Sequence, residues 1–205
     1  MARSDKGYRA DAGQFFVAGE LCRRELVAVV TMGNCPNTDI LVSNAGGTCF
    51  AHVPVKTFVP GNRTCSVGMK AERDFGPAFF WVLAGIPIPD SGKKFEFFIV
   101  PSLDMASLIS ESFRTWVSTP GAKGQAHDAE NTVRAIQLPP RVEKNGWSLE
   151  PFRSRWDLIT NAVATQQIVR ADGPRAPWLA ALGELHSGPP LNSDPLGSRM
   201  SLNVN

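Results

Sequence analysis

The chain has 205 residues, 43% of them hydrophobic and 20% charged, with a formal net charge of +2 at pH 7. This composition is ordinary for a globular protein, and the length suits one domain with an added end. No segment approaches the roughly 20 apolar residues of a membrane span, which excludes a membrane-spanning protein. The mild positive charge permits a nucleic-acid partner without requiring one.

Cysteine usage and the start of the chain indicate the compartment. The cysteines are Cys22, Cys35, Cys49 and Cys65, with no C-x-x-C pair and no histidine at zinc-finger spacing. The first residues, MARSDKGYRADAG, lack the apolar segment of a secretion signal. We therefore predict a cytoplasmic protein with reduced, buried cysteines, although an even count also permits two disulfides.

The first half of the chain predicts a helix followed by strands. Residues 1–11 are expected to be mobile, and residues 12–25 (AGQFFVAGELCRRE) have helical spacing of apolar side chains. Residues 26–32 (LVAVVTM) and 39–43 (DILVS) read as short strands. The sequence NAGG at 44–47 predicts a hairpin turn into a partner strand at 49–58.

The second half predicts more strands and then helices. Strands are expected at 66–70, 79–86, 95–100 and 133–138, with a polar loop at 118–131. Helices are expected at 103–116, N-capped by Ser102, and at 147–159. The order predicts an α/β fold with a mixed sheet flanked by helices.

The end of the chain changes in composition. We predict a domain at 1–165 and a Pro/Gly-rich extension at 166–205. A short helix is expected within it at Trp178–Leu185, and the last 19 residues are expected to be disordered.

Strand alternation brings charged residues together. His52, Pro54 and Lys56 lie on one face of the 49–58 strand. Asp39 begins the neighbouring strand of the same hairpin, so its carboxylate and the Lys56 ammonium are expected at one end of the sheet. Glu20, from the preceding helix, is expected to face the same point.

Such a cluster has a recognisable chemistry. Two carboxylates and a backbone carbonyl can hold Mg²⁺ or Mn²⁺, which prefer oxygen ligands and keep several waters. A nearby lysine orients water and stabilises developing negative charge. A phosphodiester is the fitting substrate, because metal and lysine together stabilise its non-bridging oxygens.

The segments GQFFVAGELCRRE, NCPNTDILVS and HVPVKT, in this order, resemble the PD-(D/E)XK nuclease superfamily, which has the restriction-endonuclease-like fold. The resemblance covers roughly residues 12–160 and implies an αβββαβ core and Mg²⁺-dependent cleavage of DNA. It matches Glu20 to the helix carboxylate, Asp39 to the metal-binding aspartate and Lys56 to the catalytic lysine. The metal would be held by Glu20, Asp39 and the carbonyl of Val55.

One position departs from the superfamily pattern. Two residues before the lysine, where Glu or Gln is usual, the chain has Pro54, which offers no side-chain oxygen. His52 is a candidate accessory ligand on the same face. Two functions follow: a metal-dependent DNA endonuclease, or an inactive nuclease-like module that binds DNA, RNA or a protein partner. A homodimer would suit cleavage of both strands.

Each residue also has an ordinary structural interpretation. Asp39 can cap a turn, and Lys56 can guard a strand edge. Glu20 can pair with Arg23 or Arg24 on the helix surface. His52 can be a structural histidine. The loop cations can be solvated or can contact phosphates; they are Arg63, Lys70, Arg73, Lys93 and Lys94.

Overall fold

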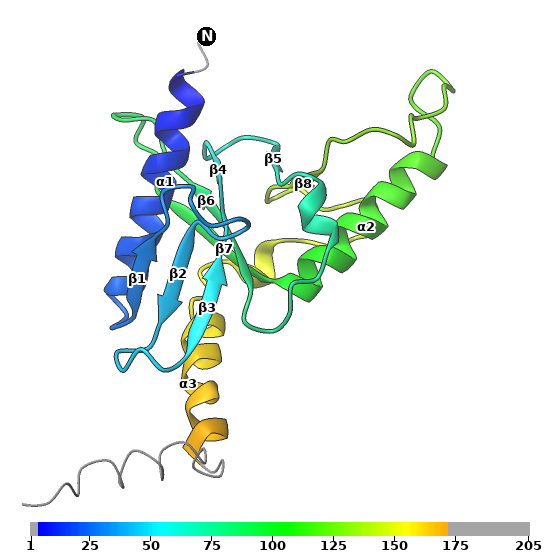
Figure 1. Cartoon of the computed structure of the whole chain (residues 1–205). Coiled ribbons are helices and arrows are strands. Elements are labelled where there is room, and N and C mark those ends of the chain that lie inside the picture. Colours follow the sequence, from blue (N-terminus) through cyan, green and yellow to red (C-terminus); the bar gives the residue numbers. More distant parts are fainter. Residues whose placement is uncertain (1–3, 172–205) are drawn as a thin grey trace, which may run out of the picture. The chain divides into compact units, whose positions relative to one another are not determined.

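Residues 4–171, the part of the chain that the computed structural model describes, contain three α-helices and eight short strands (Figure 1). In chain order the elements are α1 (Ser4–Cys22), β1 (Val27–Val30), β2 (Ile40–Ser43), β3 (Phe50–Val53), β4 (Val55–Phe58), β5 (Thr64–Ser66), β6 (Phe80–Gly85), β7 (Glu96–Pro101), α2 (Ser102–Ser118), β8 (Ala135–Gln137) and α3 (Asp157–Ala171). Single 3₁₀ turns occur at Met69–Glu72 and Glu150–Phe152. The predicted α/β class is confirmed.

The strands form three small sheets. β1, β2 and β3 pair antiparallel, with Ile40 opposite both Val30 and Val53. In the second sheet, β6 lies between β4, to which it is parallel, and β7, to which it is antiparallel. β5 and β8 form an antiparallel pair. The sheet predicted as mixed is therefore the β4–β6–β7 sheet.

Pro54 separates β3 from β4. The N–H of His52 donates to the carbonyl of Ala78 (2.8 Å), and the N–H of Val82 donates to the carbonyl of Pro54 (3.0 Å). The chain therefore runs beside β6 from His52 onward, but proline has no N–H to donate at the position between. The single strand predicted for residues 49–58 is consequently two strands, which belong to different sheets.

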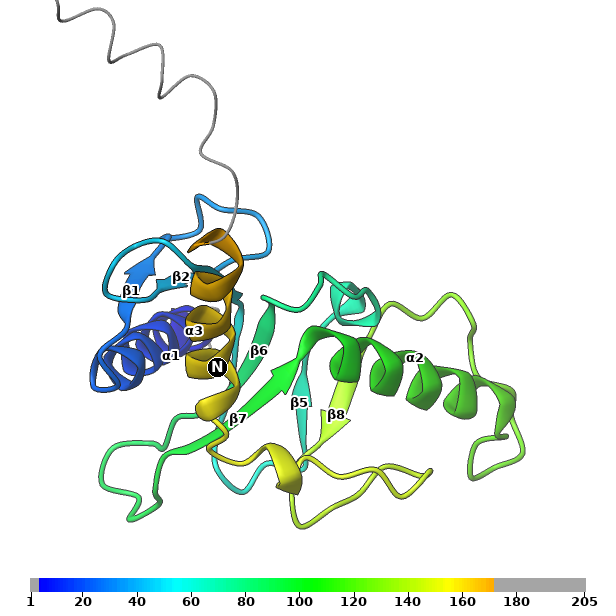
Figure 2. The same cartoon turned by 90° about the horizontal axis from the view of Figure 1, so that it is seen from below.

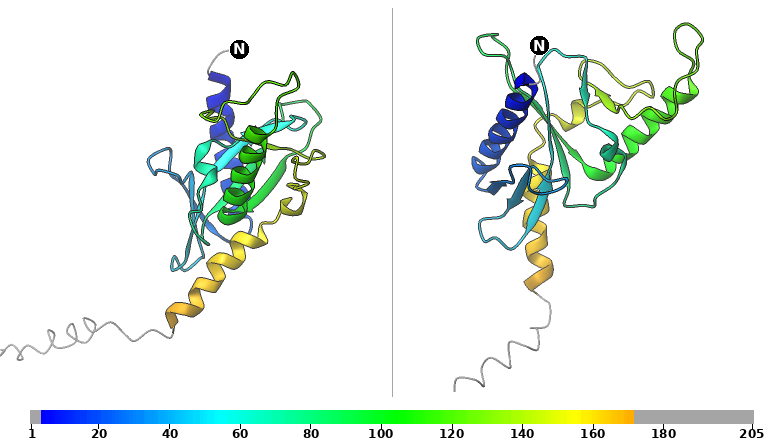
Figure 3. Two further views of the ribbon diagram at one scale, coloured as in Figure 1. Left: turned by 90° about the vertical axis from the view of Figure 1, so that its right-hand side faces the viewer. Right: turned by 45° about the horizontal axis from the view of Figure 1, so that its top comes forward.

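Side chains on the two faces of the β4–β6–β7 sheet fill two separate cores. Val82 and Ala84 of β6 pack with residues of α1, α3 and the first sheet. Trp81 and Leu83, which point the opposite way, pack with α2, β5 and β8. Every residue of β6 is buried. The turned views show α1 and α3 on one side of this sheet and α2 on the other (Figures 2 and 3).

A glycine sets the distance between α1 and β4. A Cβ atom added at Gly13 would lie 2.2 Å from Cγ2 of Thr57 and 3.6 Å from Cγ1 of Val55. No side chain larger than hydrogen fits here without movement, because 2.2 Å is far inside van der Waals contact. The residue that follows, Gln14, is therefore held beside the first residues of β4.

Two element boundaries predicted in the first 70 residues are wrong. The first helix begins at Ser4, so residues 4–11 are helical and were wrongly expected to be mobile. This stretch is polar, and the apolar periodicity that predicted the helix does not extend into it. The strand predicted at 66–70 is at Thr64–Ser66 instead, where it pairs with β8.

Two helix predictions also need correction. Ser102 is the first residue of α2 and not its cap; its Oγ accepts the N–H of Phe75 at 2.7 Å. The helix predicted at 147–159 begins only at Asp157. Trp147 and Phe152 stack with ring centroids 5.5 Å apart, but between them the chain forms a 3₁₀ turn at Glu150–Phe152, with Pro151 as its second residue, and no α-helix.

The predicted extension falls mostly outside the described residues. α3 continues to Ala171, and the expected helix at 178–185 and disordered end lie beyond it. Among the residues described, no helix has both the length and the apolar character needed to cross a membrane.

Candidate functional site

Asp39 lies where β2 begins, and its side chain reaches β4. Its carbonyl accepts the N–H of Thr31 (2.9 Å), which fixes the backbone beside β1. Its Oδ2 accepts the N–H of Val55 at 2.7 Å, and the side-chain amide of Gln14 lies 3.4 Å from Oδ1. The carboxylate is thus held between α1 and β4, with the two oxygens on different partners.

The carbonyl of Val55 faces the same edge of β4. β4 is the outer strand of its sheet, and the adjacent Pro54 carbonyl points to β6. Within a strand, the N–H and C=O of one residue point to one edge and those of the next residue to the other. Because the Val55 N–H points to Asp39, the Val55 carbonyl lies on that edge as well.

The side chain of Lys56 projects from the face opposite α1. It is half-buried, and its Nζ lies 5.9 Å from the ring centre of Trp81, within the range of a cation–π interaction. Burial raises the pKa of the neighbouring Cys65 thiol to about 12, against the smaller opposing effect of the Lys56 charge. Among residues 4–171, no ion pair joins Lys56 to Asp39.

His52 lies on the same face as Lys56. Its Nδ1 is 3.0 Å from Oγ1 of Thr38, and its ring stacks on Phe79 with centroids 6.3 Å apart. The side chain is exposed. Thr38 is itself buried and precedes Asp39 directly, so the Thr38–His52 contact ties the start of β2 to β3.

Glu20 is not brought to Asp39. Its carboxylate oxygens lie 2.6 Å from Arg23 and 2.7 Å from Arg24, and these contacts, led by the Arg24 hydrogen bond, lower the pKa of Glu20. The Arg24 guanidinium in turn lies 4.8 Å from the ring centre of Trp156. These contacts match the interpretation of Glu20 as a glutamate that pairs with Arg23 and Arg24 on the helix surface.

Gln14 is the helix residue beside Asp39, and the sequence reasoning missed it. Gln14 precedes Glu20 by six positions, about 9 Å of helix rise. Gly13 could have indicated this contact from the sequence, because a glycine within a helix that packs on a strand marks a close approach of the two backbones. The residue next to it is then a candidate to reach the strand edge.

The donor set at this edge suits a hard cation only in part. Within residues 4–171, no three His, Cys, Asp or Glu side chains come together as a metal site. The Asp39 carboxylate and the Val55 carbonyl nevertheless share one edge, and Mg²⁺ sites often use one or two carboxylates, waters and substrate phosphate. These two groups fit Mg²⁺ or Mn²⁺, whereas Glu20, as placed, does not join them.

Comparison of the chain with models of protein families and with curated proteins gives no match. Among solved structures, the chain is similar to the bacterial homing endonuclease I-Ssp6803I, with a TM-score of 0.43 and 11% sequence identity. The alignment covers 78% of this chain and 95% of that one. At this level of similarity, the assignment of a site rests on the contacts of Asp39, Val55 and Lys56.

Proposed function

We propose that this chain is a metal-dependent endonuclease that hydrolyses phosphodiester bonds of DNA at Asp39 and Lys56. The observation that carries the proposal is the 2.7 Å hydrogen bond from the Val55 N–H to the Asp39 carboxylate. It joins the metal-binding aspartate expected from the sequence to the residue immediately before the expected catalytic lysine.

Each residue has a separate task. The Asp39 carboxylate and the Val55 carbonyl would hold Mg²⁺ or Mn²⁺, which when bound supplies charge stabilisation to phosphate oxygens and a more acidic water. The Val55 N–H holds Asp39 in one orientation, and Gln14 supports it from α1. Lys56 stabilises the negative charge that develops on the phosphate and orients the attacking water. Its contact with Trp81 restricts where the ammonium lies.

The roles of Glu20 and His52 remain predictions, and we propose each role in a narrower form. Glu20 would have to leave Arg23 and Arg24 to bind metal, so we assign the helix position at the site to Gln14. His52 is exposed and lies on the Lys56 face, where it can contact a phosphate group. Two copies of the chain would be needed to cut both strands of a duplex at once.

Supercoiled plasmid tests the proposal. The wild-type protein is incubated with Mg²⁺, Mn²⁺ or EDTA, beside Asp39→Asn, which keeps an oxygen for the Val55 N–H. Metal-dependent nicking or linearisation is expected from the wild type, with at least a 100-fold loss in Asp39→Asn. Equal cleavage by a folded Asp39→Asn protein would overturn the assignment.

A second function is favoured by Pro54 and by the single carboxylate at this edge. On this account, the chain is an inactive nuclease-like module that binds nucleic acid or a protein partner. It predicts retardation of DNA or RNA that weakens with salt, because phosphate contacts release counterions. Cleavage would be absent with every metal tested, and DNA binding would be the same in wild type and Asp39→Asn.

A further inference from the structure

β1 is the outer strand of the first sheet, and one of its edges pairs with no other strand of the described chain (Figure 1). The N–H of Thr31, which directly follows β1, donates to the carbonyl of Asp39 at the start of β2. Because successive residues of a strand point their N–H and C=O groups to opposite edges, those of Ala28 and Val30 point away from β2. Within residues 4–171, no hydrogen bond satisfies these four groups.

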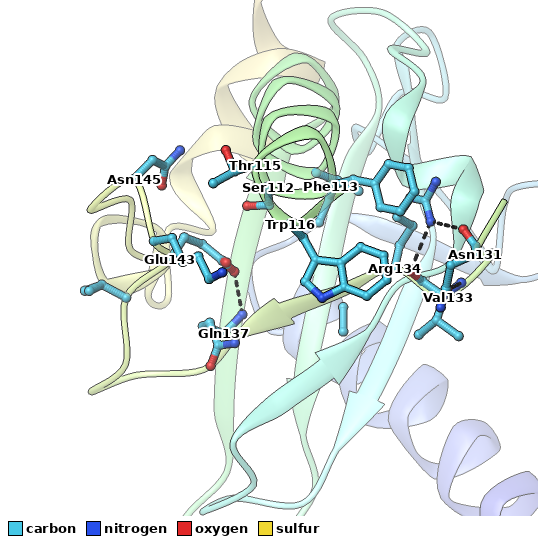
Figure 4. A pocket seen from close by; sticks show the side chains of 14 residues that line it. Ser112, Phe113, Thr115, Trp116, Asn131, Val133, Arg134, Gln137, Glu143 and Asn145 are labelled. Carbon is cyan, nitrogen blue, oxygen red and sulfur yellow. Dashed lines mark hydrogen bonds between the residues drawn. The ribbon is translucent and has the colours of Figure 1, made fainter. Parts of the chain in front are cut away.

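The outer edges of β7 and β8, by contrast, are covered by other parts of the chain. On β7, the carbonyl of Phe97 accepts the N–H of Ser154 at 2.8 Å. On β8, the N–H of Gln137 donates to Oε1 of Glu143 at 2.7 Å (Figure 4). The edge of β1 has no such cover among the described residues, so its backbone groups face solvent.

β1 also lacks most of the features that keep an exposed edge from pairing with another chain. Such features are charged side chains, proline, a bulge or a very short strand. Val27–Val30 (VAVV) has only its short length, because it carries no charge or proline and pairs with β2 in an unbroken register. Val27 and Val29 are 45% and 53% exposed, and valine favours strand pairing. The edge is therefore free to accept one more strand.

We propose that this edge joins two copies of the chain, with β1 of one copy antiparallel to β1 of the other. A two-fold axis at Val29 sets Ala28 of each copy opposite Val30 of the other. Both pairs then exchange their N–H and C=O groups, which forms four hydrogen bonds. A register centred on Ala28 forms fewer, because it sets Val30 opposite Leu26, whose N–H already donates to the carbonyl of Leu21.

A second copy suits this edge because the pairing opposes no like charges. In the register centred on Val29, the charged residues Arg23, Arg24 and Glu25 of one copy lie nearest the uncharged residues 33–35 (GNC) of the other. Val29 faces its own counterpart as a non-hydrogen-bonded pair, the arrangement in which opposite side chains lie closest. The interface is therefore self-complementary in hydrogen bonding, in charge and in side-chain packing.

Sedimentation equilibrium of the full-length protein, without DNA and with EDTA and a reductant, tests the association. Strands of four residues make a small interface, so we expect monomer at about 5 µM and mostly dimer at about 500 µM. Val29→Lys sets two ammonium groups opposite each other at the axis and should weaken dimerisation at least 10-fold. Val142→Lys, at an exposed loop valine away from β1, is the control and should not. Monomer at every concentration, or equal dimerisation of wild type and Val29→Lys, would overturn the proposal.

Amide hydrogen exchange distinguishes pairing at the edge from packing of two sheet faces. Between about 5 and 500 µM protein, exchange at the N–H groups of Ala28 and Val30 should slow at least 5-fold, because only edge pairing gives them acceptors. The N–H groups of Val27 and Val29, which point to β2, should change less. Unchanged exchange at Ala28 and Val30 in a protein that dimerises would place the contact elsewhere and refute the assignment.

Cysteine cross-linking tests the register, and it still decides if Val29→Lys does not fold. The exposed Cys22 and Cys35 are first replaced by serine. Val29→Cys should then form a disulfide-linked dimer under mild oxidation, since the Cα atoms of a non-hydrogen-bonded pair lie about 4.5 Å apart, within disulfide range. Val27→Cys, on the same face of the same strand, would lie about 14 Å from its counterpart and should not. Cross-linking through Val27→Cys but not through Val29→Cys would contradict the register.

Under the proposed nuclease function, which this consequence assumes, the pairing sets two sites on one side of the dimer. The two-fold axis of an antiparallel pair is perpendicular to the sheet, so both copies present the face of His52 and Lys56 in the same direction. The interface itself does not depend on nuclease activity. Its tests contain no DNA, and Asp39→Asn should dimerise as the wild type does, so failure of the interface and failure of the nuclease are separate results.

Discussion

The backbone N–H of Val55 donates a 2.7 Å hydrogen bond to Oδ2 of Asp39. This one contact fixes the aspartate against the interrupted strand and aligns the Val55 carbonyl with it. It also gives Asp39 a structural task in addition to its proposed chemical one. The two tasks can be separated by substitution.

We expect Asp39→Ala to destabilise the fold more than Asp39→Asn. Alanine leaves the half-buried Val55 N–H without its acceptor, which costs about 1–3 kcal/mol, whereas asparagine keeps an oxygen in place. The measurement is the free energy of unfolding from urea denaturation of both variants. Equal stability of the two would mean that the Val55 contact contributes nothing, and Asp39→Asn is for this reason the better activity variant.

Gly13→Ala should weaken the packing of α1 on β4. The added methyl would meet Cγ2 of Thr57 at 2.2 Å, and overpacking of this kind costs about 1–3 kcal/mol, against up to about 1 kcal/mol gained in helix propensity. Thermal unfolding should show a net loss of stability.

Two further variants control that measurement. Thr57→Ser removes the clashing methyl, so it should recover most of the loss when combined with Gly13→Ala. Gly19→Ala lies on the same helix with nothing within 4 Å and should be stabilising. A stabilising effect of Gly13→Ala itself would contradict the close approach.

The variants Glu20→Gln and Gln14→Ala test which residue of α1 takes part in the site at Asp39. Because the pKa of Glu20 is lowered in the folded state, its ion pairs stabilise the protein above its unfolded pKa and are lost as pH falls through the folded value. Glu20→Gln should therefore cost less than about 1 kcal/mol near neutral pH and nothing in acid. Plasmid cleavage should persist in Glu20→Gln and fall about 10-fold in Gln14→Ala; the reverse order would restore Glu20 as a metal ligand.

The cysteines should divide into two reactive and two protected thiols. Cys22 and Cys35 are exposed, Cys49 and Cys65 are buried, and all four are free. A thiol reacts as its thiolate, which burial of Cys65 disfavours by raising its pKa to about 12. At pH 8, a thiol reagent should modify two cysteines in the native protein and four after denaturation. Rapid modification of all four in the native state would contradict the burial of Cys49 and Cys65.

The sequence predicted the strands near the site but not how they divide. The alternation His52, Pro54, Lys56 was enough to place these residues on one face, since a strand has a period of two. The division of one predicted strand into β3 and β4 depends on pairing with β6, which lies more than twenty residues later in the chain. Local sequence does not contain that information, although the proline indicated the point of interruption.

For a related reason, the helix residue expected from the sequence differs from the helix residue that lies beside Asp39. Glu20 was chosen for its charge, and local contacts with Arg23 and Arg24 satisfy that charge on the helix surface. Which side of α1 meets β4 depends on a steric detail, the absence of a side chain at Gly13.

Supercoiled-plasmid cleavage by Lys56→Met tests whether the Lys56 ammonium takes part in phosphodiester hydrolysis. Methionine keeps an unbranched apolar side chain beside Trp81 but removes the charge, so the fold should persist. With Mg²⁺ or Mn²⁺, we expect the wild type to nick or linearise the plasmid, and Lys56→Met to lose at least 100-fold in rate. Lys123→Met, at an exposed loop position outside the site, should cleave as the wild type does. Metal-dependent cleavage that is unchanged in a folded Lys56→Met protein would show that Lys56 takes no part in the reaction.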